Sequence, residues 1–182
     1  NLQRTLGLTT IFVTHDQEEA MTTADRMAVL DQGVLQQVGS AAGLYDFPVN
    51  RFVAGFVGTT NLLEGQVTAV NAETVRFHAQ GVGELTLPSP PHPPRAGSAA
   101  LAFRPHQVDI RVRDELAEPS RVWVEGVVES AEFLGEFSRY RVRVGEAALV
   151  SDQPHYAGLS MFPPGAQVRL GIEPTQVRFL AD

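Results

Sequence analysis

The stretch LAFRPHQVDI at residues 101–110 returns as LGIEPTQVRF at residues 170–179, and this pair decides the fold. A second pair, LLEGQV at residues 62–67 and WVEGVV at residues 123–128, occurs in the same order along the chain. Two separate matches in one order indicate an internal duplication rather than chance. Each copy holds short alternating apolar segments separated by Gly, Pro, Asn and Asp, which is typical of small all-β barrels and sandwiches.

The duplicated unit predicts a mostly β domain over residues 59–182. Each copy contains a valine three positions after a proline: Pro105 and Val108 in the first, Pro174 and Val177 in the second. This size and strand content favour a five-stranded barrel of OB type, present twice. The segment LPSPPHPP at residues 87–94 is predicted to be a loop, because proline cannot serve a central strand.

Several side chains of this domain have a structural interpretation beside a functional one. Trp123 alternates with apolar neighbours, which favours barrel core over a platform for stacking bases. Arg104 is either a structural ion-pair partner or a ligand contact. In one segment, basic and apolar residues alternate, so a strand there would have one basic face and one apolar face. This pattern predicts a half-buried strand rather than a nucleic-acid surface. Its basic face is Arg139, Arg141 and Arg143, and its apolar face is Tyr140, Val142 and Val144.

The first 58 residues have a different character and predict the tail of an α/β domain. The β-branched run Thr9–Thr14 fits a strand buried in a parallel sheet. Asp16, with Glu19 three residues later, is a capping signal for a helix over about residues 17–23.

Further elements are predicted between this helix and the β domain. A hairpin joins strands at residues 27–30 and 34–39, and Ser40 caps a short helix that includes Tyr45. Another helix follows over residues 50–57. Its apolar face is predicted to be Phe52, Val53, Phe56 and Val57.

Composition excludes several classes of site. The chain has no Cys, so it has no disulfide and no Cys-ligated metal. All 14 basic residues are Arg. Without Lys, neither a GxxxxGK[ST] phosphate loop nor a Schiff-base lysine exists here. The net charge of −7 and the scattered arginines argue against nucleic acid as a partner. No apolar run reaches the roughly 18 to 20 residues that span a bilayer.

The candidate for chemistry is His15, at the predicted end of the Thr9–Thr14 strand. Ligands of open α/β sheets bind beyond the carboxyl ends of the strands. A histidine there can donate a hydrogen bond to a phosphoryl oxygen or to an attacking water. The alternative is a histidine without a ligand. The other histidines (His78, His92, His106 and His155) lack the spacing of metal ligands.

Residues 6–58 resemble the C-terminal third of the ATP-binding subunit of an ABC importer. The resemblance rests on the runs THDQEEA at 14–20, ADR at 24–26, QVG at 37–39, NRFVA at 50–54 and FVG at 56–58. It implies that His15 is the switch-loop histidine, which contacts the γ-phosphate of ATP in the closed dimer. It also implies that Asp16 communicates across the dimer interface, while its other reading remains the helix cap. The departure SAAG at 40–43, where a proline and an acidic residue are commoner, weakens the local helix prediction.

Residues 59–182 resemble the TOBE domain that follows the ATPase domain in importers of oxyanions, sugars, ferric iron and polyamines. The motifs are NLLEG at 61–65, Arg104-Pro105, EG at 125–126 and EFLG at 132–135. In that family, paired OB-like barrels mediate dimer contacts and sometimes carry regulation. The two resemblances together cover nearly the whole chain.

The resemblance implies a transport ATPase at the cytoplasmic face of the inner membrane. The full-length protein is expected to use ATP and Mg²⁺, to form a homodimer with a second ATPase subunit, and to bind membrane permease subunits. Spermidine and putrescine are the favoured solutes. The 182 residues themselves are expected to need no cofactor and not to hydrolyse ATP, because the phosphate loop, Gln loop, LSGGQ and Walker B motifs are not among them.

Two alternatives stay open at this point. One is a stand-alone TOBE module that binds a small anion, and the other is an OB-fold nucleic-acid binder. A structural expectation also follows for the first 58 residues. Since the strand Thr9–Thr14 would lack parallel neighbours, that segment is expected to be disordered, rearranged or paired with another copy, while the β domain folds alone.

Overall fold

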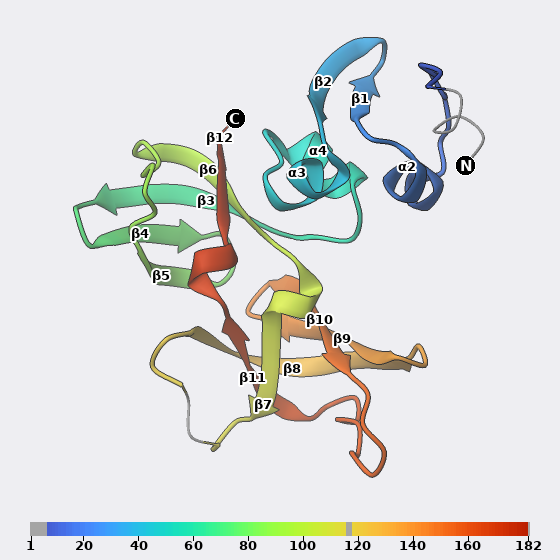
Figure 1. The fold of residues 1–182 in the computed structure, drawn as a ribbon. Coiled ribbons are helices and arrows are strands. Elements are labelled where there is room, and N and C mark those ends of the chain that lie inside the picture. The colour runs from blue at the N-terminus through green and yellow to red at the C-terminus, as the bar shows by residue number, and fades with distance from the viewer. Residues whose placement is uncertain (1–6, 116–117, 182) are drawn as a thin grey trace.

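The computed structural model describes residues 7–115 and 118–181. Two five-stranded antiparallel sheets form the bulk of the molecule, and a small unit of helices with one hairpin lies beside the first sheet (Figure 1). The mostly β fold predicted from the duplication is confirmed. Residues 1–6, at the start of the predicted α/β segment, lie outside the described residues.

The N-terminal unit forms most of the elements that its sequence predicts. They are α2 (Gln17–Thr23), β1 (Met27–Asp31), β2 (Val34–Gly39), α3 (Ala41–Asp46) and α4 (Arg51–Phe56). Each helix has a side-chain cap at its N-terminus, from Asp16, Ser40 and Asn50 respectively. These caps satisfy main-chain N–H groups that a helix leaves without partners, so short helices can form here.

The strand predicted at Thr9–Thr14 is not formed. The segment from Leu8 to Thr14 has no strand hydrogen bonds, and the Ile11 and Val13 side chains are both 91% exposed. A β-branched run needs a neighbouring strand to satisfy its main-chain groups, and β1 pairs with β2 instead. The prediction of a strand is therefore wrong for this segment, and the expected disorder or rearrangement does not extend to residues 17–57, which form the predicted helices and hairpin.

The buried face of α4 also differs from the predicted one. Val53, Ala54 and Val57 are buried, whereas Phe52 and Phe56 are more than a third exposed and stack on each other with ring centroids 5.5 Å apart. Ala54 lies in a cluster with Ala102 and Leu180 of the first sheet. The small side chains let the helix approach the sheet closely, and this approach turns the aromatic rings outward.

The first sheet has the strand order β12-β6-β3-β4-β5 and the second has the order β10-β9-β8-β11-β7. The first comprises β3 (Asn61–Val70), β4 (Thr74–Ala79), β5 (Gly83–Pro88), β6 (Gly97–Phe103) and β12 (Arg178–Ala181). The second comprises β7 (Val108–Val112), β8 (Val122–Phe133), β9 (Phe137–Val144), β10 (Ala147–Pro154) and β11 (Gln167–Ile172).

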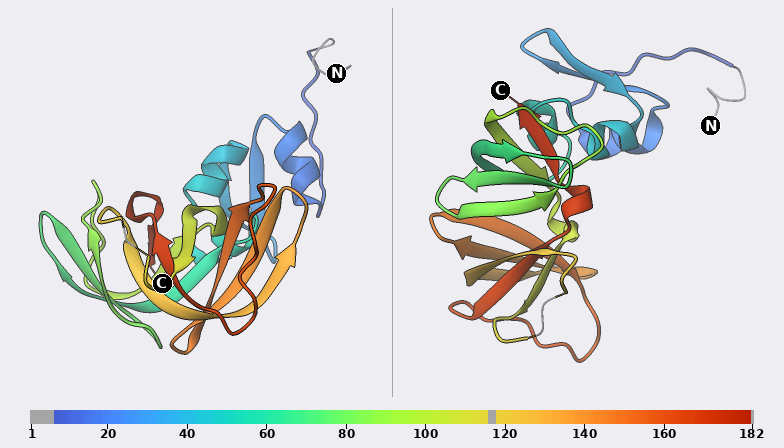
Figure 2. Two further views of the ribbon diagram at one scale, coloured as in Figure 1. Left: turned by 90° about the horizontal axis from the view of Figure 1, so that it is seen from below. Right: turned by 90° about the vertical axis from the view of Figure 1, so that its left-hand side faces the viewer.

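The two copies exchange their last strands, which the duplication alone did not predict. Strand β7 of the first copy pairs with β11, and β12 of the second copy pairs with β6. A 3₁₀ turn makes each crossing: η1 (Pro105–Gln107) or η2 (Pro174–Gln176). The proline at the start of each turn has no N–H to continue the ladder, so the chain leaves one sheet and enters the other. The predicted five-stranded units are thus confirmed, but each is completed by the other copy (Figure 2).

Equivalent residues meet where the two crossings pass each other. The side-chain amide of Gln107 donates to that of Gln176 at 3.3 Å. One apolar cluster, which includes Leu63 and Phe103 of the first sheet and Val142 and Leu170 of the second, connects the sheets. The β domain therefore has a shared core rather than two separate ones.

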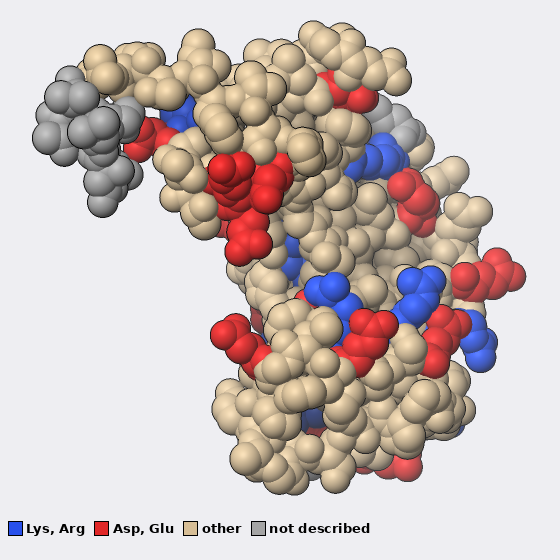
Figure 3. Space-filling view, turned by 90° about the vertical axis from the view of Figure 1, so that its right-hand side faces the viewer, with Lys and Arg blue, Asp and Glu red and all other residues tan. Residues whose placement is uncertain are grey.

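The outer face of the second sheet is an array of ion pairs. Arg139 pairs with Asp152 at 2.8 Å, and Arg141 and Arg143 both pair with Glu129. Tyr140, Val142 and Val144 point inward and are buried. The predicted half-buried strand is confirmed, and Figure 3 shows the two charges interspersed on one side of this sheet.

Trp123 lies on the outer face of the second sheet and not in the core as predicted. Its ring covers Gly171 of the neighbouring strand, where an added Cβ would lie 2.7 Å from the ring. Its indole N–H donates to the carbonyl of Glu118 at 2.8 Å, and Arg169 lies 5.4 Å from the ring centroid. A glycine in a strand leaves a gap on the sheet surface, and the indole fills it.

Gly145, in the turn between β9 and β10, lies against Gly81 in the turn between β4 and β5, and its replacement by alanine is expected to destabilise the fold. Its φ is +60°, and an added Cβ would lie 1.9 Å from the carbonyl oxygen of Gly81. Gly135 is a matched control, because its φ is +84° but nothing lies within 4 Å of an added Cβ. Gly135→Ala should cost about 1 kcal/mol for the left-handed backbone, and Gly145→Ala about 1–3 kcal/mol more for the overlap. Urea unfolding measures both, and equal losses would show that the two turns do not touch in solution.

Candidate functional site

His15 lies in an exposed bend between residues 9–14, which form no strand, and the start of α2. Its side chain has no hydrogen bond or ion pair with any residue that the structure describes. Its two neighbours are fixed, since Thr14 Oγ1 accepts from Asp16 N at 3.0 Å and also donates to the carboxylate of Glu19 at 3.3 Å. A histidine on a fixed turn, with an exposed side chain, can donate to a ligand oxygen.

Asp16 is the N-cap of α2, as one of its two readings predicts. Its Oδ1 accepts from the main-chain N–H of Glu19 at 3.0 Å. The Asp16 side chain is exposed, so one carboxylate oxygen can cap the helix while the other faces solvent. A contact across a dimer stays a prediction.

Helix α2 is tied to the end of α4 by a hydrogen bond that the sequence did not predict. Gly58 N lies 3.1 Å from Gln17 Oε1 and 3.2 Å from Phe56 O, so the amide hydrogen is shared between two acceptors. Met21 of α2 also packs against the cluster of Val29 and Val53. The turn that carries His15 is thus attached to the folded unit through α2.

Arg104 is a buried cation that joins this unit to the first sheet. Only 4% of the residue is exposed. Its guanidinium donates to four main-chain carbonyl oxygens, those of Tyr45 (2.7 Å), Ala54 (3.1 Å), Gly58 (3.2 Å) and Thr59 (3.2 Å). It also lies 3.9 Å from the centroid of the Tyr45 ring. We call this set of contacts the Arg104 junction.

The acceptors explain why a buried arginine is tolerated without a bonded carboxylate. Tyr45 lies in the last turn of α3, and Ala54, Gly58 and Thr59 lie at or just beyond the end of α4. Helix C-termini present carbonyl oxygens that lack partners and carry partial negative charge. Burial lowers the pKa of Arg104, and the neighbouring Tyr45 and Asp46 partly offset that effect. Arg104 is therefore structural, although its partners are carbonyls rather than the predicted ion-pair partner.

Two more arginines hold the helical unit on the sheet. Arg51 of α4 forms a two-pronged pair with Glu64 of β3 and donates to the carbonyl of Ala181. Arg178 of β12 donates to the carbonyl of Asp46 at 3.0 Å and lies over the Phe47 ring. Arginine suits such contacts because its planar group makes several directed hydrogen bonds at once.

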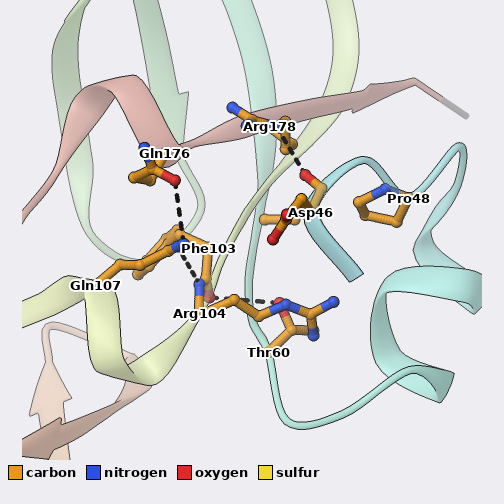
Figure 4. A pocket seen from close by; sticks show the side chains of 9 residues that line it. Asp46, Pro48, Thr60, Phe103, Arg104, Gln107, Gln176 and Arg178 are labelled. Atoms are coloured by element: carbon orange, nitrogen blue, oxygen red, sulfur yellow. Dashed lines mark hydrogen bonds between the residues drawn. The ribbon is translucent and has the colours of Figure 1, made fainter. Parts of the chain in front are cut away.

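A small cavity lies between these contacts and the crossing of the two copies. Figure 4 shows Arg104, Gln107, Gln176 and Arg178 around it. Its volume of ≈ 20 Å³ is enough for about one water molecule. No group of three His, Asp or Glu residues that could hold a metal ion occurs among residues 7–115 and 118–181. Within the same ranges, no helix is long and apolar enough to cross a membrane.

Comparison with protein families finds the TOBE domain over residues 101–180. The chain contains a TOBE domain. The matched residues include both crossings, so this domain in our chain is built from strands of both sheets. A solved structure of the cytoplasmic molybdate-binding protein ModG, with molybdate bound, aligns with a TM-score of 0.55 at 17% identity. The alignment covers 67% of our chain and 96% of ModG, which supports the TOBE fold alone.

The chain is also similar to polyamine importer subunits over nearly all of its length. The spermidine/putrescine import ATP-binding protein PotA of Rubrobacter xylanophilus is 37% identical over 171 residues, which are 92% of our chain and 44% of that protein. PotA of Ruegeria pomeroyi and PotA 1 of Pseudomonas aeruginosa are each 34% identical over 100% of our chain and 48% of theirs. The predicted relationship to importer ATP-binding subunits is confirmed. The chain spans about half the length of these relatives.

Proposed function

We propose that the chain is the C-terminal part of the ATP-hydrolysing subunit of a solute importer, in which ATP hydrolysis drives uptake across the membrane. The observation that supports this proposal is the similarity to PotA proteins, which includes the helical unit as well as the TOBE domain. A TOBE module of another kind of protein would match over the β domain only. Residues 1–58 are proposed to be the end of the nucleotide-binding domain and residues 59–182 the regulatory and dimerisation domain.

In this proposal His15 is the residue that reaches the nucleotide. It would donate a hydrogen bond to the γ-phosphate of ATP and hold the attacking water in place. Since residues 1–182 contain no lysine and no phosphate loop, they cannot hold ATP and Mg²⁺ by themselves. The isolated chain is therefore proposed to be inactive, and Mg²⁺ would neutralise phosphate charge only in a full-length subunit.

The proposed partners are a second ATPase subunit and membrane permease subunits. Asp16 would contact the second subunit with the carboxylate oxygen that does not cap α2. The complex would lie at the cytoplasmic face of the inner membrane. Spermidine or putrescine is the proposed solute, because the relatives named above import these polyamines.

A stand-alone module that binds a small anion is the second candidate. The ModG likeness gives it the right fold, but anion binding needs cations that are not already paired. The arginines that ring the cavity donate to main-chain carbonyls, and the cavity has room for about one water only. These observations favour the transport role.

A graft tests the proposal. In this fusion protein, called the graft, the upstream half of P. aeruginosa PotA 1 is joined to residues 1–182. The graft is expressed in a strain from which PotA 1 has been deleted. We expect ATP hydrolysis by the purified graft and restored uptake of labelled spermidine. The upstream half alone is the control and should do neither. A folded graft that dimerises like PotA 1 but does not hydrolyse ATP contradicts the proposal, and binding of molybdate or phosphate by the isolated chain would favour the anion module.

A further inference from the structure

We propose that Gln17 is a positioning residue, which fixes the turn that carries His15 to the Arg104 junction and so couples ATP hydrolysis to the state of the TOBE domain. The inference rests on the proposed function, since it takes His15 to act on the nucleotide. It assigns a role to a side chain that belongs to the run THDQEEA but for which the resemblance implies no function.

Gln17 is the nearest side chain to His15 that reaches the rest of the fold. It is the first residue of α2, two positions after His15, and its side chain is half-buried. Its Oε1 accepts from the N–H of Gly58, 41 residues away in sequence. The His15 side chain is exposed, and Asp16 bonds only within the same turn. Among residues 15–17, Gln17 is therefore the one whose side chain bonds to another part of the described structure.

The other end of this bond is itself fixed. Gly58 has a φ of +80°, and an added Cβ would lie 3.0 Å from the Tyr45 ring. Its carbonyl oxygen accepts from Arg104 Nη1 at 3.2 Å. The N–H of Gly58 thus donates to Gln17 of α2, and its carbonyl oxygen accepts from Arg104. A shift of the guanidinium would therefore move Gly58 and, with it, the side chain of Gln17.

The connection continues to the crossing of the two copies. Arg104 N donates to Gln107 Oε1 at 2.9 Å, and Gln107 Nε2 donates to Gln176 Oε1 at 3.3 Å. A rotation of one sheet on the other must change the bond between the two glutamines, because they belong to different crossings. The path from the crossing to Gln17 consists of directed hydrogen bonds through one buried cation, and the main chain joins Gln17 to His15. Such networks have discrete arrangements rather than a continuous range.

The role of Gln17 is to hold the His15 side chain in the position that the reaction requires. A group that must meet a phosphate in one geometry loses rate when it is displaced by about 1 Å, with losses up to about 100-fold. With Gln17 shortened, α2 keeps its Asp16 cap but loses its bond to the Arg104 junction.

The experiment uses the graft described above, with Gln17→Ala compared with Glu18→Ala. Glu18 is the next residue of α2 and is exposed, and its side chain makes no bond in the described structure, so it controls for any change in the helix. We expect Gln17→Ala to lower kcat for ATP about 10-fold while KM for ATP changes less than about two-fold, because placement of His15 matters in the closed state. Gln17→Glu keeps an oxygen acceptor for Gly58 N and should recover most of the rate.

A double-mutant cycle with Arg104→Lys tests the coupling. If both residues act through Gly58, the two losses in kcat should not multiply, and Gln17→Ala should cost little once Arg104 is replaced. Independent losses would overturn the proposed path. If Gln17→Ala lowers kcat no more than Glu18→Ala does, the role of Gln17 is overturned and the proposed function stays intact. If the unmodified graft does not hydrolyse ATP, both are overturned.

A measurement without nucleotide tests the bond itself. Amide hydrogen exchange at Gly58 and along α2 in the 182-residue chain should be about 10-fold faster in Gln17→Ala than in Glu18→Ala, with exchange in β8 and β9 unchanged. Equal exchange in the two variants would overturn the inference, because it would show that Gln17 does not hold Gly58.

Discussion

Arg104→Ala is expected to destabilise the chain by about 3–5 kcal/mol, because several buried carbonyl oxygens lose their donor at once. The substitution leaves carbonyl oxygens at the ends of α3 and α4 without their donor and opens a void beside Tyr45. Buried acceptors without donors cost about 1–3 kcal/mol each, less where water enters. Chemical denaturation with both tryptophan fluorescence and circular dichroism measures the loss.

The controls separate the charge from its directed contacts. Arg104→Lys keeps the charge but offers one point donor instead of a planar group, so we expect it to lose more than half as much as Arg104→Ala. Arg76→Ala, on the exposed face of β4, should change stability by less than about 0.5 kcal/mol. If Arg104→Ala were as stable as Arg76→Ala, the Arg104 junction would not form in solution.

His15→Ala in the graft is expected to lower ATP hydrolysis by about 10²–10³-fold, the cost of removing one donor from a developing oxyanion. Binding of ATP should change little, because the phosphate loop of the upstream half holds the nucleotide in this proposal. Thermal unfolding should also be unchanged, since the His15 side chain is exposed and makes no bond in the described residues. Rates over a range of ATP concentrations separate the two effects.

His78→Ala provides the matched comparison for that experiment. His78 is also exposed and pairs only with Glu84 on the neighbouring strand, so its loss should leave the rate within about two-fold of the unmodified graft. A His15→Ala graft that hydrolyses ATP as fast as the His78→Ala graft would remove His15 from the proposed mechanism.

Local signals in the sequence predicted local structure well. Capping residues located α2 and α3, the spacing of apolar residues located α4, and a two-residue turn with glycine located the β1–β2 hairpin. Period-two alternation separated the charged and buried faces of β9. Each of these signals acts over a few residues, so that distant parts of the chain do not alter it.

Features that depend on distant partners were missed. The strand exchange requires β7 to prefer β11 over its own copy, and nothing within residues 101–112 specifies this choice. Trp123 was misplaced because its face depends on Gly171 across the strand pair. The partners of Arg104 are main-chain carbonyls, which every residue has, so the spacing of side chains could not show them. The bond from Gln17 to Gly58 escaped prediction for the same reason.

The exchange of β7 and β12 gives the β domain the topology of a strand-swapped dimer whose two subunits have been joined end to end. Each half alone would have a sheet with a missing edge and a protruding strand that fits only the other half. The two halves are therefore obligate partners within one polypeptide, and a lesion in either one leaves both incomplete. Duplication of a gene for a small swapped homodimer would produce this arrangement in one step, and the fused chain would then be free to give its two halves different surfaces. In the described chain the two halves do differ in their surfaces, since the helical unit packs on the first sheet and the second has no counterpart.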